Sequence, residues 1–347
     1  MTDFEKICSF DALYRAHLKA KKGKARKKEV LAFELNLNPS LEMLRTSLKN
    51  GTYRMSGYRY FRIYEPKGRD IYETCHIDKI VMHALCDEVL LPRLSPHFIY
   101  DNAACQVGKG THFAMRRFTE KLVYYYKHHG RDFYVLKCDI SAYFASIHHG
   151  TLEKLLRKLI KDEGVMDLLS HFIASYEDGD KSGVGLPLGN QTSQWFALFY
   201  LSEFDHYVKE SLRIKGYMRY MDDFLLIHED KIFLLEVLEE IGVYLEFYLG
   251  LTLNPKTAVI KASAPVEFLG WRFFIGANGG IVRRLKAQSK MRYKRGIGDK
   301  FSQFKMGAIT FVALVQSVES YDGHLRHGNA YRLRMGVMGD LGALSLR

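Results

Sequence analysis

Residues 217–227 read Tyr217-Met-Arg-Tyr-Met-Asp-Asp-Phe-Leu-Leu-Ile227, two apolar stretches that flank the adjacent carboxylates of Asp222 and Asp223. The flanking residues favour β-strands, so the segment predicts a hairpin with both carboxylates at its turn. Aspartate is common in turns because it tolerates the backbone conformations that turns need, and this property alone could explain the pair. Adjacent carboxylates are also suited to binding a divalent cation. Both interpretations stay open for this segment by itself.

A second acidic site lies upstream, at the end of another predicted strand. Phe133 to Cys138 is a continuous apolar, β-rich run of the kind found in buried strands, and it leads directly into Asp139. Two-metal phosphoryl transfer needs acidic ligands from separate elements that converge on ions about 3.5–4 Å apart. Asp139 and Asp222 could supply these ligands, and the backbone carbonyl of Ile140 could add another oxygen. The pattern therefore favours a site for two Mg²⁺ ions.

Six segments, in order along the chain, resemble the motifs of a reverse transcriptase. The segment from Asp139 to Phe144 resembles motif A, and residues 220–223 resemble motif C. The other four are Lys67-Gly-Arg69 for the basic fingers motif, Gly185–Gln194 for motif B, Leu253–Thr257 for motif D and Phe268-Leu-Gly270 for the primer grip of motif E. The resemblance implies an RNA-directed DNA polymerase with the right-hand fold of fingers, palm and thumb.

Motif B indicates which group of reverse transcriptases the chain resembles. Leu188 precedes the glycine of this motif and Gln194 follows its serine, whereas reverse transcriptases related to group II introns and retroviruses carry Gln and Pro there. The pattern is similar to the reverse transcriptases of diversity-generating retroelements, which copy a template RNA and misincorporate opposite adenine. Residues 16–28, 100–112 and 323–332 resemble the same group. This resemblance implies mutagenic cDNA synthesis and a small basic pentameric accessory protein as a partner.

The resemblance also implies roles for single residues. Asp139, Asp222 and Asp223 would form the metal-binding catalytic site with the carbonyl of Ile140, and Phe144 matches the steric gate that excludes a ribose 2′-hydroxyl. Residues that would contact the nucleotide, template or primer are Lys67, Arg69, Leu188, Gly189, Gln194 and Tyr220, with Phe268, Leu269 and Gly270 at the primer grip. Lys256 is either a proton donor to the pyrophosphate or an ordinary surface lysine.

The charge of the chain agrees with a nucleic-acid partner. A formal net charge of +12 and a pI near 9.3 attract a polyanion such as template RNA with its DNA or RNA primer. The basic residues form two clusters: Lys19, Lys21, Lys22, Lys24, Arg26, Lys27 and Lys28, and then Arg283, Arg284, Lys286, Lys290, Arg292, Lys294 and Arg295. The first cluster is equally compatible with a solvated face. The second lies where a thumb would meet the template–primer backbone, so nucleic-acid binding is favoured there.

The length of 347 residues predicts several subdomains, because one hydrophobic core stops growing below this size. We expect a basic N-terminal extension over 1–56, fingers over 57–132, a palm with part of the fingers interleaved over 133–275, and a helical thumb over 276–347. The expected class is α+β, with helices packed on one face of an antiparallel sheet. Apolar periodicity predicts helices over residues 81–91, 112–126, 151–161, 191–212 and 233–248.

Localisation and structural metal sites can be addressed from composition. No run approaches 18 apolar residues and the first residues lack the layout of a signal peptide, which predicts a cytoplasmic protein without a membrane partner. The five cysteines are scattered without a Cys-x-x-Cys pair, so neither zinc nor a disulfide framework is expected. His148 and His149 are expected to make a surface cap or a backbone contact rather than to bind metal.

Three functions remain in comparison. The first is the error-prone polymerase of a diversity-generating retroelement. The second is a defence-associated reverse transcriptase, of the abortive-infection type, that uses a dedicated noncoding RNA. The third is a non-enzymatic RNA-binding relative, which the intact Asp139, Asp222 and Asp223 argue against.

Overall fold

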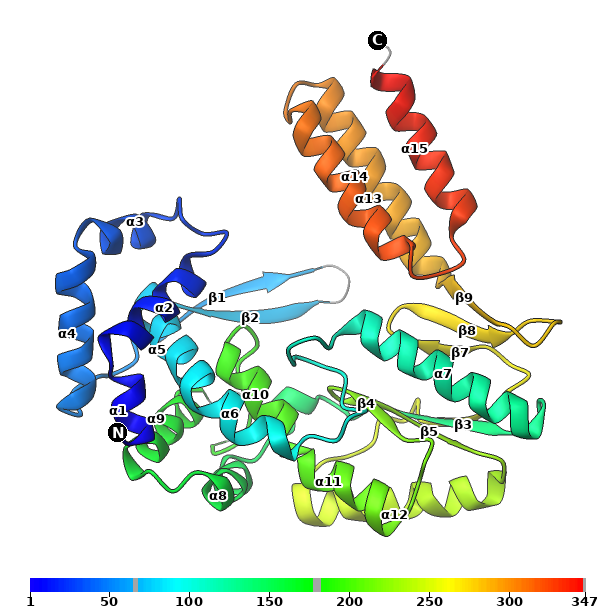
Figure 1. Ribbon diagram of the computed structural model, residues 1–347, viewed down its shortest axis with the longest axis horizontal. Coiled ribbons are helices and arrows are strands. Elements are labelled where there is room, and N and C mark those ends of the chain that lie inside the picture. Colours follow the sequence, from blue (N-terminus) through cyan, green and yellow to red (C-terminus); the bar gives the residue numbers. More distant parts are fainter. Residues whose placement is uncertain (65–67, 177–181, 346–347) are drawn as a thin grey trace.

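The computed structural model describes residues 1–64, 68–176 and 182–345 (Figure 1). Helices open the chain, and the first two begin at residues that cap them: the Thr2 side chain accepts a hydrogen bond from the Glu5 N–H, and the Ser9 side chain accepts one from the Ala12 N–H. These first helices are α1 (Asp3–Ile7), α2 (Phe10–Lys21), α3 (Lys28–Leu35) and α4 (Leu37–Lys49).

An antiparallel hairpin and a run of helices follow. Strands β1 (Tyr58–Ile63) and β2 (Arg69–Thr74) pair along their whole length. After them, α5 (His76–Leu85) continues through a π-helical segment (Cys86–Leu90) into α6 (Leu91–Leu94) and a 3₁₀ turn (Ser95–His97), and α7 (Thr111–His129) completes this part.

The central sheet has four antiparallel strands in the order β4-β5-β3-β6. Their bounds are β3 (Tyr134–Cys138), β4 (Met218–Tyr220), β5 (Asp223–His228) and β6 (Ala258–Lys261). Cys138 at the end of β3 pairs with Phe224 of β5. This register brings the residue after β3, Asp139, next to the turn that joins β4 and β5.

Both faces of this sheet are covered, so the prediction of helices on one face was wrong. Leu136 and Leu226 belong to a core that includes α12, whereas Val135 and Leu225 belong to a second core that includes α7. Figure 1 shows α7 on one side of the strands and α12 on the other. Neighbouring residues of a strand point to opposite faces, so two covered faces need apolar residues at consecutive positions.

The helices between the strands of this sheet include those predicted over 151–161 and 233–248, with shifted ends, and α9, which was not predicted. They are α8 (His149–Leu159), α9 (Glu163–Ala174), α10 (Gln191–Tyr200), α11 (Ser202–His206) and α12 (Lys231–Leu249), with a 3₁₀ helix (Tyr143–Ser146) before α8 and a π-helical segment (Tyr207–Ser211) after α11. The single helix predicted over 191–212 is therefore interrupted at Leu201. Gly250 ends α12 in the left-handed conformation (φ 63°), as expected for a glycine at this position.

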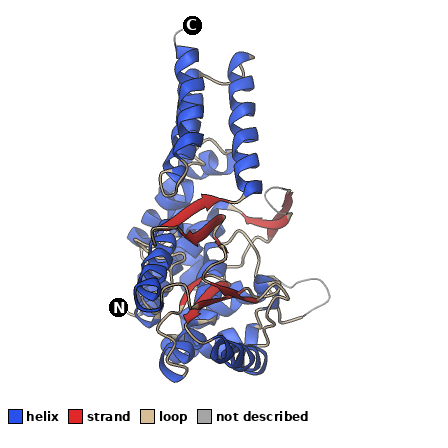
Figure 2. Cartoon of the chain, turned by 90° about the vertical axis from the view of Figure 1, so that its right-hand side faces the viewer, coloured by secondary structure: helices blue, strands red, loops and turns tan. Residues whose placement is uncertain are grey.

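A second antiparallel sheet leads into three long helices. It consists of β7 (Val266–Phe268), β8 (Trp271–Ile275) and β9 (Ile281–Leu285), and the helices are α13 (Ala287–Lys305), α14 (Phe311–Leu325) and α15 (Tyr331–Ser345). Figure 2 shows these helices rising from the strands at their base. The boundary predicted at residue 276 lies between β8 and β9 of one sheet. None of the helices in the described part of the chain is long and apolar enough to cross a membrane.

Candidate functional site

The two adjacent aspartates lie at a tight turn between β4 and β5. Tyr220 pairs with Asp223, so Met221 and Asp222 form the turn, and Met221 adopts a left-handed conformation (φ 56°). Two-residue hairpin loops need a positive φ to match the twist of their strands. The predicted hairpin is confirmed, and its turn projects Asp222 from the end of the sheet.

A buried ion pair next to this turn holds it in position. Arg219 and Asp205 are both fully buried, and the guanidinium Nη2 lies 2.6 Å from the carboxylate Oδ2. Arg219 also donates from Nη1 to the carbonyl of Met221 at 2.9 Å, and the Tyr217 hydroxyl donates to Asp205 at 2.6 Å. Neither Arg219 nor Asp205 was assigned a role from the sequence. A charged residue inside an apolar strand was the available signal for the first of them.

Asp139 is held by a neighbouring segment, the one that resembles motif D. The Asn254 backbone N–H donates to the Asp139 carbonyl at 2.8 Å, and the Asn254 side-chain Nδ2 donates to the Asp139 carboxylate Oδ2 at 3.1 Å. Ile140 faces Leu253 in an isolated bridge whose hydrogen bonds are made by the residues on either side. Asn254 thus orients the Asp139 side chain, a role that its place in the sequence did not reveal.

The carboxylates of the site repel one another. Burial, together with the Asp139 carboxylate, raises the pKa of Asp222, and the Arg69 guanidinium opposes this rise. Burial raises the pKa of Asp223 to about 7; Lys137, whose Nζ lies 3.8 Å from the carboxylate, opposes this, and Asp139 and Asp222 add to it. Repulsion between carboxylates that are partly removed from water favours the arrival of a positive charge.

The residues present fit a divalent cation. Asp223 Oδ1 is buried and lacks a hydrogen-bond partner within the described residues. No group of three or more His, Cys, Asp or Glu side chains in the described residues is arranged to hold a metal. Mg²⁺ needs fewer protein side chains than that. It is usually bound through one or two carboxylates, and substrate phosphates and water fill its remaining coordination positions. Asp139 and Asp222 would provide two such carboxylates.

The motif B loop is attached to the β1–β2 hairpin. The Tyr72 N–H of β2 donates to the Leu188 carbonyl at 2.9 Å. Gly189 has φ +128°, and a Cβ added to it would lie 2.8 Å from the Tyr72 carbonyl oxygen, so this position needs glycine for the protein contact alone. Leu188 is half-buried. Gln194 is exposed on α10, where its side-chain oxygen lies 3.7 Å from the Cys105 sulfur.

Phe144 is held at the edge of the site. It lies in the short 3₁₀ helix after Asp139, half-buried, with its ring edge-on to Tyr143 at 5.8 Å between centroids. Its carbonyl accepts a hydrogen bond from the Leu186 N–H at 2.8 Å. Both the backbone and the side chain of Phe144 are held by neighbours, so its ring is suited to steric discrimination between nucleotide sugars.

We expect Phe144→Ala to admit ribonucleotides, because a shorter side chain no longer occupies the space of a 2′-hydroxyl. The preference for dNTP over rNTP should fall by about 10- to 100-fold, the usual size of a steric effect in a pocket. Single-nucleotide incorporation with each substrate measures this preference. Tyr143→Phe provides a matched control, and unchanged sugar discrimination in Phe144→Ala would leave Phe144 as an ordinary core aromatic.

The remaining predicted contact residues are placed as follows. Lys67 lies outside the described residues, and Arg69 is exposed at the start of β2, close enough to influence Asp222. The Tyr220 hydroxyl lies 3.4 Å from the Thr111 hydroxyl. Lys256 is exposed, and its backbone N–H donates to the Asn254 side chain at 3.0 Å. Their roles stay predictions.

The predicted primer grip forms the turn between β7 and β8. Phe268 is the last residue of β7 and is fully buried, whereas Leu269 (φ 48°) and Gly270 (φ 83°) form the turn in left-handed conformations. The Lys286 N–H donates to the Gly270 carbonyl at 3.2 Å, which ties the turn to the start of α13.

The N-terminal basic cluster is partly neutralised within the chain. Lys19 pairs with Asp87 at 2.7 Å, and Lys27 pairs with Glu73 at 2.7 Å. Lys21 also pairs with a carboxylate, that of Glu34. These pairs attach α2 to the π-helical segment and to α3, and the start of α3 to β2, so part of the cluster serves packing. His149, by contrast, is a backbone contact as predicted: its Nε2 lies 2.7 Å from the Gly185 carbonyl.

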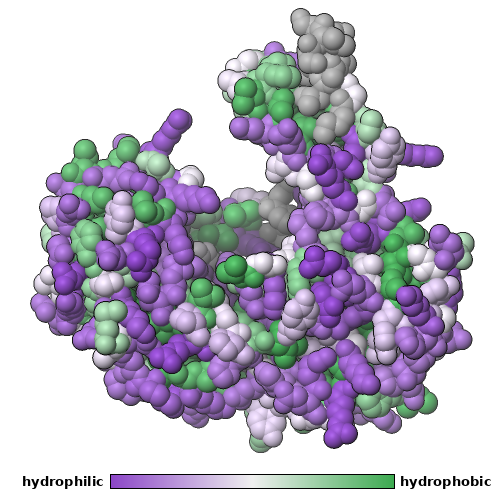
Figure 3. All heavy atoms as spheres, viewed as in Figure 1, coloured by the Kyte–Doolittle hydropathy of each residue, from purple (hydrophilic) through white to green (hydrophobic). Residues whose placement is uncertain are grey.

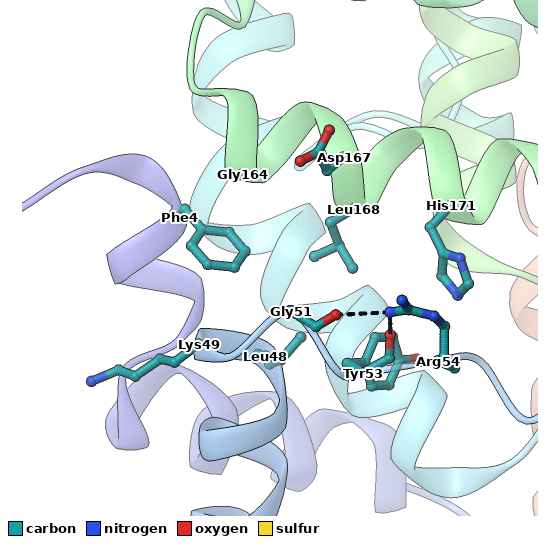
Figure 4. Close-up of a pocket in the computed structure, with 10 residues that line it drawn as sticks. All are labelled: Phe4, Leu48, Lys49, Gly51, Tyr53, Arg54, Gly164, Asp167, Leu168 and His171. Atoms are coloured by element: carbon teal, nitrogen blue, oxygen red, sulfur yellow. Dashed lines mark hydrogen bonds between the residues drawn. The ribbon is translucent and has the colours of Figure 1, made fainter.

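A pocket in the described part of the chain lies apart from the carboxylates of Asp139, Asp222 and Asp223. This pocket of about 530 Å³ lies between α1, α4 and α9 and is lined by Phe4, Leu48, Asp167, His171 and Arg54, among others (Figure 4). Within this pocket the Arg54 guanidinium donates hydrogen bonds to the carbonyls of Gly51 and Tyr53. Figure 3 shows an open concavity between the lobe of the first helices and the three C-terminal helices.

Comparison with known proteins identifies the family. The model of the family "Reverse transcriptase (RNA-dependent DNA polymerase)" matches residues 74–273, which contain Asp139, the motif B loop and the Asp222–Asp223 turn. The chain belongs to the reverse transcriptase family. The prediction of an RNA-directed DNA polymerase is thereby confirmed.

Relatives and solved structures support the same fold. Protein YkfC of Escherichia coli strain K12 is 28% identical over 304 residues, which cover 75% of each chain. A Candida albicans telomerase complexed with a TWJ fragment of telomeric RNA matches 68% of this reverse transcriptase with a TM-score of 0.52 and 13% identity, covering 46% of its own chain. An apo Candida tropicalis telomerase truncated from its C-terminal domain matches 67% of this chain with a TM-score of 0.52 and 14% identity, and the match covers 55% of the telomerase chain. The chain thus spans about half the length of these telomerases, and the predicted right-hand α+β fold is confirmed.

Proposed function

We propose that this reverse transcriptase is the error-prone polymerase of a diversity-generating retroelement, which copies a template RNA into adenine-mutagenic cDNA. The observation that carries the proposal is motif B, where Leu188 and Gln194 replace the Gln and Pro typical of related enzymes. The substrates are dNTPs, and a DNA or RNA strand primes synthesis.

The contacts of motif B explain why its side chains would affect fidelity. The backbone at Leu188 is fixed to Tyr72 of the hairpin that also carries Arg69, so the loop would keep a set position beside the proposed nucleotide site. A leucine side chain cannot donate or accept the hydrogen bonds that a glutamine can. Correct pairing then gains less over mispairing, and a loss of about 1.4 kcal/mol of discrimination is roughly a tenfold rise in error.

The roles proposed for the catalytic residues follow from their contacts. Asp139, oriented by Asn254, and Asp222, presented by the β4–β5 turn, would hold two Mg²⁺ ions, with Asp223 as electrostatic support. When bound, Mg²⁺ would stabilise negative charge on the attacking and leaving oxygens. Arg69, with Lys67, would grip the triphosphate, since a guanidinium can donate to two oxygens at once.

Further partners and the subdomain division are part of the same proposal. The second basic cluster lies on β9 and α13, and it would contact the template–primer backbone beside the primer grip of Phe268, Leu269 and Gly270. A small basic pentameric accessory protein would assist synthesis. We retain the division into a basic N-terminal extension, fingers, palm and thumb at residues 56, 132 and 275.

We expect cDNA synthesised by the wild-type enzyme to carry errors mainly opposite template adenine. Leu188→Gln should lower those errors about tenfold, because it restores a polar contact that favours correct pairing. Overall synthesis should change less than the error frequency. Sequencing of cDNA made from a template RNA with all four bases, with and without the accessory protein, measures both quantities.

The matched control is Leu186→Met, a volume-conserving change at a buried leucine of the same loop. Equal error frequencies opposite all four bases would refute the mutagenic proposal. The defence-associated function with a dedicated noncoding RNA would then be the better account of this reverse transcriptase.

A further inference from the structure

Two segments with no assigned role, residues 100–112 and 323–332, meet in the structure. The His112 ring at the start of α7 stacks on the ring of His327, which follows α14, with 3.5 Å between centroids and 20° between planes. A third imidazole, that of His324, lies 5.9 Å from His112 and 5.4 Å from the Trp271 ring. The contact joins the three C-terminal helices of the thumb to the helix above the central sheet.

The residues after His327 rest on the sheet of the primer grip. A Cβ added to Gly328 would lie 1.9 Å from a ring carbon of Trp271, the residue that follows the grip turn, so only glycine fits there. Asn329 donates its backbone N–H to the Arg283 carbonyl at 2.8 Å and accepts the Arg283 N–H with its side chain at 2.9 Å. These two bonds fix the segment along the edge of β9.

On the side of His112, the contact lies next to the β4–β5 hairpin, which carries the proposed catalytic Asp222. Thr111, next to His112, places its hydroxyl 3.4 Å from that of Tyr220, two residues before Asp222. The joint made by His112, His327, Gly328 and Asn329, here called the thumb clasp, therefore contacts the thumb and the grip sheet, and its neighbour Thr111 contacts Tyr220 at the end of β4.

We propose that His112 and His327 are positioning residues, whose ring stack holds the thumb over the primer grip so that the template–primer stays bound between nucleotide additions. The inference rests on the proposed role of residues 268–270 as the grip. Figure 1 shows α13, α14 and α15 standing away from the palm and approaching it at their lower ends. A helix of 15 residues such as α14 is roughly 22 Å long, so a small rotation at the clasp moves its far end by a much larger amount.

The clasp is expected to loosen in acid. Partial burial, with His112, Arg283 and His324 nearby, holds the pKa of His327 below its ordinary value of 6.5, and burial and His112 do the same for His324. The groups that face the stack are His112 of α7, His324 of α14 and Arg283 of β9, and all of these are cationic when protonated. Because the folded-state pKa is lowered, the contribution of the stack is present above pH 6.5 and is lost as the pH falls through the folded-state value.

The test separates positioning from folding and from chemistry. Primer extension on an RNA template with a heparin trap gives the number of nucleotides added per binding event, and single-turnover addition of the first nucleotide gives the chemical rate. His327→Ala should shorten the products at pH 7.5 by about two- to tenfold, the range expected for losing an aromatic pair, with the first addition nearly unchanged. His327→Phe, which keeps a stacked ring, should restore the length and reduce its fall between pH 7.5 and 5.5.

His128→Ala, at the other end of α7, is the matched control and should leave the product length unchanged. Unaltered product length in His327→Ala would overturn the proposal, as would failure of His327→Phe to restore it. An equal loss of product length and first addition, with a lower melting temperature, would also overturn it by showing a purely structural role. Absence of the first addition in the wild type would instead contradict the polymerase site itself.

Discussion

Asp222→Asn is expected to lower DNA synthesis by about a thousandfold or more, or roughly 4 kcal/mol of transition-state stabilisation. The substitution keeps the size of the side chain but removes the charge that the β4–β5 turn places next to Asp139. Binding of the template RNA should change little, because that affinity comes from many Lys and Arg contacts to phosphate. Primer extension in Mg²⁺ and filter binding of the same template–primer measure the two properties separately.

Asp139→Asn should behave in the same way, since both carboxylates are proposed to hold the metal ions. The control is Glu239→Gln, an equivalent change at an exposed position of α12 on the far side of the sheet. Near wild-type extension by Asp222→Asn would contradict the catalytic assignment. Loss of template binding together with extension would show instead that the turn had lost its structure.

The β4–β5 hairpin was predictable because its signals are local. Met218 to Tyr220 and Phe224 to Ile227 favour strands by composition, and the register that joins Tyr220 to Asp223 follows from a two-residue turn. The run from Phe133 to Cys138 was also correctly identified as a buried strand. Its consecutive apolar residues already implied burial of both faces, and the prediction of a single covered face did not use that signal.

The supports of the site could not be predicted in the same way, because they depend on partners far apart in the chain. Asn254 reaches Asp139 across 115 positions, and the Arg219–Asp205 pair forms only when α11 packs against β4. A single sequence carries no periodic signal for such contacts. Motif D in the sequence marked the segment of Asn254 but drew attention to Lys256, whose side chain is exposed.

The motif B loop shows a different limit of prediction from the sequence. The sequence predicted that Gly189 contacts the nucleotide or template, which stays a prediction, whereas the neighbour that the structure reveals is the Tyr72 carbonyl of β2. The same glycine thus links the hairpin of Arg69 to the loop of Leu188. A change in either segment can therefore alter the position of the other, so variants at Leu188 should be compared by fidelity and by rate together.

Arg219→Met is expected to destabilise the protein by about 3–5 kcal/mol, because it leaves the fully buried Asp205 carboxylate without its counter-charge. Tyr217 and Asn102 still donate hydrogen bonds to Asp205, but neither is charged. The melting temperature should fall by roughly 10 °C, given about 2–4 °C for each kcal/mol in proteins approaching this size. DNA synthesis should fall as well, since the Met221 carbonyl loses the donor that holds the turn of Asp222.

Two further variants test this explanation. Adding Asp205→Asn to Arg219→Met removes the unpaired charge and should recover part of the lost stability, so that the two changes are not additive. Arg157→Met, at an exposed pair with Glu163 of 3.1 Å, should cost less than about 1 kcal/mol. Thermal unfolding followed by circular dichroism compares all three. Equal melting temperatures for Arg157→Met and Arg219→Met would show that the buried pair does not stabilise the hairpin, and the position of Asp222 would then depend on the strand pairing of β4 and β5 alone.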